Sequence, residues 1–270
     1  MAAETYVQFV GTEINSATEH PIDRSLLVGF IDLIKRQPVA RVADVGCGPG
    51  RAAAFMADHG LDVVGVDPSQ TMLAVARTEH PSIQFEEGQL NALPIETGAL
   101  AGAVCWYSII YTPLDRLDEA FDELARVLMP GGHLLLAFQT DGEQVDRENA
   151  FGTHLSLTSY RHEVREIADC LEGAGFKICT TALRATELDH ETTSQGFVIA
   201  TSQRSQPAIG DTPSPSDATR SASVSREAAA YSAPPDSCAA DGESAYGTGR
   251  SNPGNPEAPS ADWTSGCSAG

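Results

Sequence analysis

Apolar residues follow two different spacings along the first 200 positions of the chain. Leu117, Phe121, Leu124 and Leu128 recur at the spacing of one helix face, whereas other segments are short and almost continuously apolar. Short continuous runs are typical of strands that are buried on both faces of a parallel sheet. The predicted strands cover residues 41–45, 61–66, 83–86, 100–107, 133–138, 176–183 and 196–201.

Predicted helices fill most of the gaps between these strands. They cover residues 22–35, 52–59, 68–79 and 160–174, and a further helix contains Leu128 and is expected to end at Pro130-Gly131-Gly132. This alternation predicts an α/β fold, a Rossmann-like three-layer sandwich around a mostly parallel seven-stranded sheet. The last two strands have no helix between them, so we expect them to form an antiparallel hairpin at one edge.

The composition changes sharply after Ser202. From residue 203 onward Ser, Ala, Pro and Gly dominate, and hydrophobic periodicity is lost. Such a segment buries too little apolar surface to offset the entropy of ordering it. We therefore predict one folded domain over residues 1–202 and a disordered tail over residues 203–270, whose role the sequence does not indicate.

The chain shows no targeting or membrane-spanning pattern. Its first residues lack a basic segment followed by an apolar run, and no apolar stretch reaches the roughly 18 residues of a membrane span. The six cysteines show no metal-ligand spacing, so we expect free thiols and no metal site. These features favour a cytoplasmic protein.

The charge is strongly acidic. The net charge is −20, of which −16 belongs to residues 1–202. A domain with this charge repels phosphate backbones at long range, and no run of Lys or Arg offsets it. Nucleic acid is therefore disfavoured as a partner, and a small molecule is favoured.

A glycine-rich loop is the most informative motif. The run Asp44-Val45-Gly46-Cys47-Gly48-Pro49-Gly50 follows a predicted strand and opens a predicted helix. Glycines at such a place allow a tight turn and let a ligand lie against the backbone. The next strand ends in Asp67, where an acid can accept hydrogen bonds from both hydroxyls of a ribose. The two features together predict a site for an adenosine-containing ligand.

The glycine spacing distinguishes between such ligands. A dinucleotide fingerprint needs a small residue where this chain has Arg51. The spacing instead suits a nucleoside that carries an amino-acid group, although a nicotinamide or flavin dinucleotide and a loop without ligand remain as alternatives.

Four motifs in order make the chain resemble the class I S-adenosylmethionine (SAM)-dependent methyltransferases, in particular their type-11 domain. They lie at residues 42–50, 64–73, 92–94 and 124–132, and the resemblance extends over about residues 20–202. The run at residues 103–111 is also similar to small actinobacterial methyltransferases of unassigned substrate. The resemblance implies SAM as cofactor and transfer of its methyl group to a small molecule.

The resemblance also implies a role for each matching position. The glycines would line the methionine part, with Asp44 orienting the loop, Asp67 would bind the ribose, and Met72, Gln89 and Leu90 would border the adenine. The implied cofactor-binding residues are Asp44, Gly46, Cys47, Gly48, Gly50, Arg51, Asp67, Pro68, Met72, Gln89, Leu90, Trp106 and Tyr107. Arg51 would pair with the SAM carboxylate, unless it is simply a surface arginine.

The sequence departs from the family pattern at two places. Gln89 stands where the family usually has Asp, although its amide oxygen can accept the same hydrogen bond. Ala101-Gly102 replaces a common Phe-Asp, for which we expect an effect on stability more than on chemistry.

Candidates for the acceptor side are fewer. Tyr107 and Tyr111 follow the fourth predicted strand, and His154 lies in the connection at residues 139–160, where this family commonly has a substrate lid; these three are the candidate catalytic residues. By analogy alone, Tyr6 and His20 are candidates for a segment that covers SAM. The main alternative is a SAM-binding or regulatory module without catalysis, since no residue is an obvious general base. The acceptor atom and the oligomeric state are not indicated.

Overall fold

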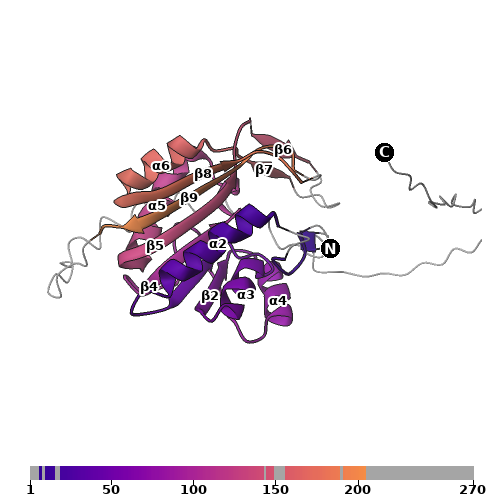
Figure 1. Ribbon diagram of the computed structural model, residues 1–270. Helices are drawn as coiled ribbons and strands as arrows, with labels where there is room; N and C mark the ends of the chain where they lie inside the picture. Colours follow the sequence, from indigo (N-terminus) through magenta and orange to yellow (C-terminus); the bar gives the residue numbers. More distant parts are fainter. Residues whose placement is uncertain are drawn as a thin grey trace, which may run out of the picture. The chain divides into compact units, whose positions relative to one another are not determined.

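The computed structural model describes residues 6–7, 10–15, 19–142, 144–148, 156–188 and 191–204, and a seven-stranded sheet lies at its centre (Figure 1). The strand order is β3-β2-β1-β4-β5-β9-β8. The strands are β1 (Arg41–Val45), β2 (Asp62–Asp67), β3 (Gln84–Glu87), β4 (Leu100–Trp106), β5 (Leu128–Gln139), β8 (Phe176–Arg184) and β9 (Gln195–Ser202).

The direction of the strands confirms the predicted α/β class. The pairs β3–β2, β2–β1, β1–β4 and β4–β5 are parallel, and β9 is antiparallel to both β5 and β8. The predicted antiparallel hairpin is therefore present, and its second strand inserts next to β5, which leaves β8 at the edge. The carboxyl ends of β1, β2 and β4 meet at one side of the sheet, where ligands bind in open α/β folds.

Helices cover both faces of the sheet and give the predicted three layers. Helices α2 (Pro21–Ile34), α3 (Arg51–Asp58) and α4 (Gln70–Glu79) bury their apolar side chains in one cluster with the sheet. Helices α5 (Leu117–Val127) and α6 (Val164–Gly173) share a second cluster on the opposite face. Both clusters consist mainly of Leu, Ile, Val, Phe and Ala, in line with the predicted periodicity.

Gly102 lies where α2 packs directly on β4. A Cβ atom at this position would lie 2.4 Å from the Cδ1 atom of Ile34 and 2.7 Å from the Cζ atom of Phe30. The absence of a side chain therefore lets a bulky helix approach the strand. This close packing gives a structural reason for the departure from the family pattern at Ala101-Gly102.

The boundary between α5 and β5 differs from the prediction. Leu128 does not complete the helix, because α5 ends at Val127 and Leu128 opens β5 by pairing with Leu100. Pro130-Gly131-Gly132 lies inside β5, where the register with β4 shifts between Leu100 and Gly102. Leu128 and Gly132 are buried and Pro130 between them is exposed, so the extra residues form an irregularity within β5 instead of a separate loop.

The segments after β4 and after β5 also contain structure that the apolar pattern did not predict. Strands β6 (Val145–Arg147) and β7 (Leu157–Ser159) form a separate antiparallel pair. Two short 3₁₀ helices, η1 (Ile109–Tyr111) and η2 (Leu114–Arg116), follow β4. Helix α6 begins at Val164 and not at residue 160, because the amides of Tyr160 and His162 bind carbonyl groups of Ile110 and Gln139.

Some predictions fall on residues outside the described ranges. Only Gln203 and Arg204 of the predicted tail are described, so the tail over residues 203–270 stays a prediction. His154 lies outside the described residues as well. Among the helices of the described ranges, none combines the length and the apolar character needed to span a bilayer.

Candidate functional site

The glycine loop is held tightly between the ends of β1, β2 and β4. Three glycines of the loop have positive φ angles, which residues other than glycine rarely adopt: +73° at Gly46, +53° at Gly48 and +87° at Gly50. The amide of Gly46 donates to the carbonyl oxygen of Val66 at 2.7 Å. A Cβ atom on Gly46 would lie 2.3 Å from the Cβ atom of Ser108, so only glycine fits between these strand ends.

Asp67 ends β2 beside this loop. One carboxylate oxygen accepts a hydrogen bond from the amide of Gly48 and the other from the amide of Ser69, both at 2.8 Å. Burial raises the pKa of Asp67, and these two hydrogen bonds lower it. Each carboxylate oxygen has two acceptor positions, so each keeps one for a further donor. The geometry leaves Asp67 able to bind two hydroxyl groups at once.

Asp44 and Cys47 contribute to the loop from inside. The Oδ2 atom of Asp44 accepts a hydrogen bond from the amide of Ala53 at 2.8 Å, which ties β1 to the first turn of α3. Burial raises the pKa of Asp44 to about 7. The side chain of Cys47 is buried against Gly65, and its thiol donates to the carbonyl oxygen of Gly48 at 3.7 Å. Both residues therefore hold the loop in place through buried contacts.

Two further segments border Asp67. On one side Ser69 caps α4, and half-buried Met72 lies in the first turn of this helix, while Pro68 is exposed. On the other side the amide of Gly88 donates to the carbonyl oxygen of Asp67 at 3.3 Å, which brings the following residues, exposed Gln89 and half-buried Leu90, next to it. The structure thus brings the predicted adenine-side residues to one place, and their role there stays a prediction.

The segment before α2 lies over the loop. The Cε1 atom of Tyr6 is 4.0 Å from the position that a Cβ atom on Gly48 would take. Arg51 binds the carboxylate of Glu19 at 2.5 Å, and the indole of Trp106 donates to the same carboxylate at 3.4 Å. Arg51 is thus not a surface arginine. In the structure it anchors the segment before α2, and its pairing with a ligand carboxylate stays a prediction.

Tyr107 occupies a strained position at the end of β4. Its φ angle is +60°, which is uncommon for a residue with a large side chain and is often found at functional sites. Burial raises the pKa of Tyr107 well above its usual value, and the charges of Asp23 and Glu19 raise it further. The hydroxyl therefore stays protonated at neutral pH, which suits a hydrogen-bond donor and not a general base. Tyr111, in η1, is 45% exposed.

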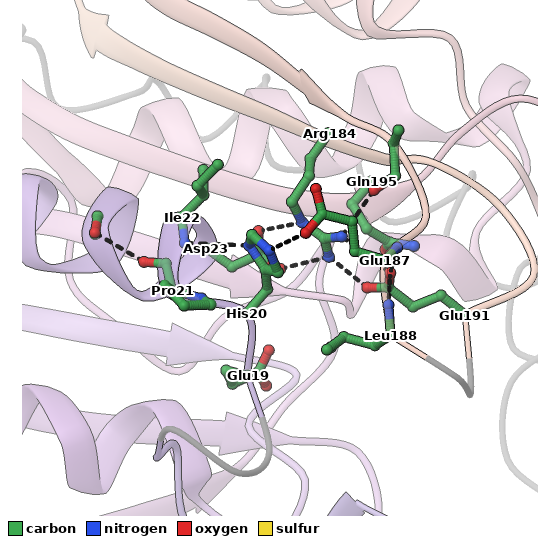
Figure 2. A network of polar contacts seen from close by, with 12 residues as sticks. Glu19, His20, Pro21, Ile22, Asp23, Arg184, Glu187, Leu188, Glu191 and Gln195 are labelled. Carbon is green, nitrogen blue, oxygen red and sulfur yellow. Dashed lines mark hydrogen bonds and ion pairs between the residues drawn. The ribbon is translucent and has the colours of Figure 1, made fainter. Parts of the chain in front are cut away.

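The sequence did not predict a buried network of ion pairs near Tyr107 (Figure 2). Arg184, at the end of β8, binds both oxygens of Asp23 at 2.7 and 2.8 Å and also pairs with Glu191. His20 caps α2 by accepting from the amide of Ile22, and its other ring nitrogen contacts Glu187 at 2.9 Å. His20 therefore fixes the start of α2 in the structure, and its predicted place over SAM stays a prediction. Asp23 and Arg184 are 161 residues apart, so no local pattern could have paired them.

Comparison with known proteins finds similar methyltransferases. Residues 42–132 match the family model described as a methyltransferase domain. A malonyl-[acyl-carrier protein] O-methyltransferase of Enterobacter lignolyticus is 36% identical over 101 residues, which are 37% of this chain and 39% of that protein. An uncharacterized methyltransferase of Mycobacterium tuberculosis is 34% identical over 118 residues, which are 43% of this chain and 46% of that protein. The chain spans about half the length or less of these curated relatives.

Solved structures share the fold. A SAM-dependent methyltransferase of Methanosarcina mazei superposes with a TM-score of 0.56 at 17% identity, over 68% of this chain and 98% of that chain. A magnesium protoporphyrin IX methyltransferase of Synechocystis, solved with bound SAM, gives a TM-score of 0.51 at 20% identity, over 66% and 77% of the two chains. The Mycobacterium relative agrees with the expected actinobacterial resemblance. Residues 42–132 therefore match a methyltransferase domain in sequence, and the chain shares the fold of solved SAM-dependent methyltransferases.

Proposed function

We propose that this protein transfers a methyl group from SAM to a small-molecule acceptor. The observation that carries the proposal is Asp67, whose two oxygens are held by the amides of Gly48 and Ser69 at 2.8 Å beside the glycine loop. This arrangement presents two free acceptor positions at the carboxyl ends of the strands. It matches the needs of a ribose whose base and amino-acid parts extend to either side.

The residues present fit SAM as a ligand. Asp67 would hold the ribose hydroxyls, and the backbone of the glycine loop would lie against the methionine part. Half-buried Met72 and Leu90 offer apolar surface for the adenine, and exposed Gln89 offers an amide oxygen for its amino group. When bound, SAM supplies a methyl group that is already activated on a positively charged sulfur.

The protein itself mainly aligns the reactants and excludes water. Alignment of this kind contributes about 7–11 kcal/mol to lowering a barrier. The contacts that hold the segment before α2 in place, among them Arg51 with Glu19, support a role of this segment as a cover. Tyr107, held by the hydrogen bond of its amide to Ala137 at 2.9 Å, would position the acceptor by donating from its protonated hydroxyl.

The acidic charge of the chain supports a small-molecule acceptor rather than a nucleic acid. The names of the relatives do not identify it, since one names a malonyl-acyl carrier protein and another, from Renibacterium salmoninarum, names demethylmenaquinone. A cytoplasmic location belongs to the same proposal. The described cysteines, Cys47, Cys105, Cys170 and Cys179, are all free thiols, which supports a reducing compartment.

Calorimetric titration with S-adenosylhomocysteine, the product that remains after methyl transfer, tests the cofactor site. We expect micromolar binding by the wild-type protein and at least a hundredfold loss in Asp67→Ala. Asp62→Ala is the matched control, because Asp62 is an exposed carboxylate at the opposite end of the same strand. Equal affinity in Asp67→Ala and wild type would overturn the assignment.

Turnover of SAM with a panel of small-molecule acceptors tests catalysis separately. Formation of S-adenosylhomocysteine that depends on an acceptor supports the enzyme. Tight binding of S-adenosylhomocysteine without turnover of any acceptor would instead favour the SAM-binding module without catalysis.

A further inference from the structure

Two arginines near the candidate site have no carboxylate partner. Arg147 lies in β6, and Arg161 follows β7. In the part of the chain that the structure describes, neither forms an ion pair, although the chain carries 37 acidic side chains against 17 basic ones. Arginines that do pair with a carboxylate are Arg51, Arg116, Arg126, Arg165, Arg184 and Arg204. Other described cations, among them Arg24, Arg36 and Arg77, form no ion pair either. Position, and not the lack of a partner alone, therefore distinguishes Arg147 and Arg161.

The backbone places Arg161 at the carboxyl side of the sheet. On either side of it, the amide of Tyr160 donates to the carbonyl oxygen of Ile110 at 2.7 Å and that of His162 donates to Gln139 at 3.1 Å. These carbonyl groups follow β4 and end β5, so Arg161 lies across the carboxyl ends of these two strands. This is the side of the sheet on which the acceptor would approach the cofactor.

The guanidinium of Arg161 is incompletely bonded. Its Nε atom is buried and has no hydrogen-bond partner among the described residues, and its one contact is from Nη2 to the hydroxyl of Thr192 at 3.5 Å. A buried N–H without an acceptor is destabilising, and more so when the group is charged. An oxygen from a ligand would satisfy it.

Tyr111 connects this pair to the cofactor side. Burial raises the pKa of Tyr111, while the charge of Arg147 lowers it and that of Asp67 raises it, so the hydroxyl lies within electrostatic reach of both residues. Burial lowers the pKa of Arg161, and the charge of Arg147 lowers it further. Arg147 and Arg161 thus repel each other, and an anion bound by both would relieve the repulsion.

Two other arginines of this region are already neutralised. Arg184 binds Asp23 and Glu191, and Arg51 binds Glu19. We propose that the methyl acceptor carries an anionic oxygen group, a carboxylate or a phosphate, and that Arg147 and Arg161 bind it. Arginine suits this task because its fork of N–H donors matches the oxygens of both groups. The proposal rests on the proposed function and adds the chemical class of its substrate.

Nuclear magnetic resonance of the arginine Nε–H groups tests the site directly. The ¹⁵N-labelled full chain, saturated with S-adenosylhomocysteine, is titrated with sodium phosphate, with benzoate and with neutral benzamide. We expect saturable shifts of the Arg161 signal with phosphate or benzoate and none with benzamide; the tighter of the two anions identifies the group. The signal is assigned by its loss in Arg161→Gln.

Variants separate this site from general charge effects. Arg147→Gln should weaken anion binding at least tenfold, and Arg165→Gln, which removes a 92% exposed arginine on α6, should leave it unchanged. Arg161→Lys keeps the charge and serves if Arg161→Gln does not fold. In the variants, chemical-shift changes on the remaining arginines follow the binding.

The outcomes distinguish the two proposals. Absence of a saturable shift with either anion, or unchanged anion affinity in both Arg147→Gln and the folded Arg161 variant, overturns the anion site while binding of S-adenosylhomocysteine persists. Loss of S-adenosylhomocysteine binding by the wild-type protein would instead overturn the proposed function. In turnover, acceptors with a carboxylate or phosphate should react at least tenfold faster than their amide or alcohol analogues, and Arg161→Lys should reduce this preference.

Discussion

Replacing Arg184 by Gln would leave two buried carboxylates without their cation. The side chains of Asp23 and Glu191 are 2% and 7% exposed, and both bind Arg184 (Figure 2). Removal of one partner from a buried pair typically costs about 3–5 kcal/mol, because the remaining charge stays buried and unpaired. For a folded region of about 200 residues this corresponds to a fall in the melting temperature of roughly 6–20 °C.

The pH dependence gives a second signature. Burial raises the pKa of Glu191, but hydrogen bonds from Arg184 and from the amides of Glu187 and Leu188 bring it down to about 2, against an ordinary value of 4.5. Because the folded pKa is the lower one, the stabilisation is present above pH 4.5 and is lost as the pH falls toward 2. The difference of the two values corresponds to about 3 kcal/mol at neutral pH.

Urea denaturation between pH 3 and 8 measures both effects. We expect Arg184→Gln to unfold at lower urea than wild type at pH 7 and to lose less additional stability between pH 4.5 and 3. The control is Arg165→Gln, which removes an exposed arginine whose nearest carboxylate is 3.9 Å away, and it should behave as wild type. The reasoning is refuted if Arg184→Gln loses less than about 1 kcal/mol at pH 7, or if its acid sensitivity equals that of wild type.

Two further predictions concern the glycine loop and its support. Gly46→Ala forces a side chain against Ser108 at a φ angle of +73°, so it should destabilise the fold by about 1–3 kcal/mol and weaken binding of S-adenosylhomocysteine. The control is Gly29→Ala in α2, where no atom lies within 4 Å and the change should stabilise the fold by about 0.5–1 kcal/mol. Equal melting temperatures for the two variants would contradict this prediction. Burial raises the pKa of Asp44 to about 7 from 3.8, so the ligand-free protein should lose stability as the pH rises between these values. Thermal melts at pH 5 and pH 8 should show this loss in the wild-type protein and not in Asp44→Asn. Parallel pH profiles of the two proteins would contradict the prediction.

The sequence by itself determined the architecture and which residues of the candidate cofactor site come together. Strand and helix periods, the glycine loop and Asp67 can be recognised from short-range pattern. The loop follows one strand and Asp67 ends the adjacent one, and the carboxyl ends of neighbouring parallel strands meet at one edge of the sheet. The boundary at Leu128 could not be obtained in this way. An apolar residue at helical spacing also suits a buried strand, and only pairing with Leu100 decided between them.

The tertiary structure alone decided which charges are satisfied. Arg184 pairs with Asp23 across 161 positions, and Arg51 is bound by Glu19 across 32. Arg147 and Arg161, which look like the other arginines in the sequence, have no carboxylate partner among the described residues. Whether a charge is paired depends on the distance between side chains in space and on their removal from water, and neither follows from separation along the chain.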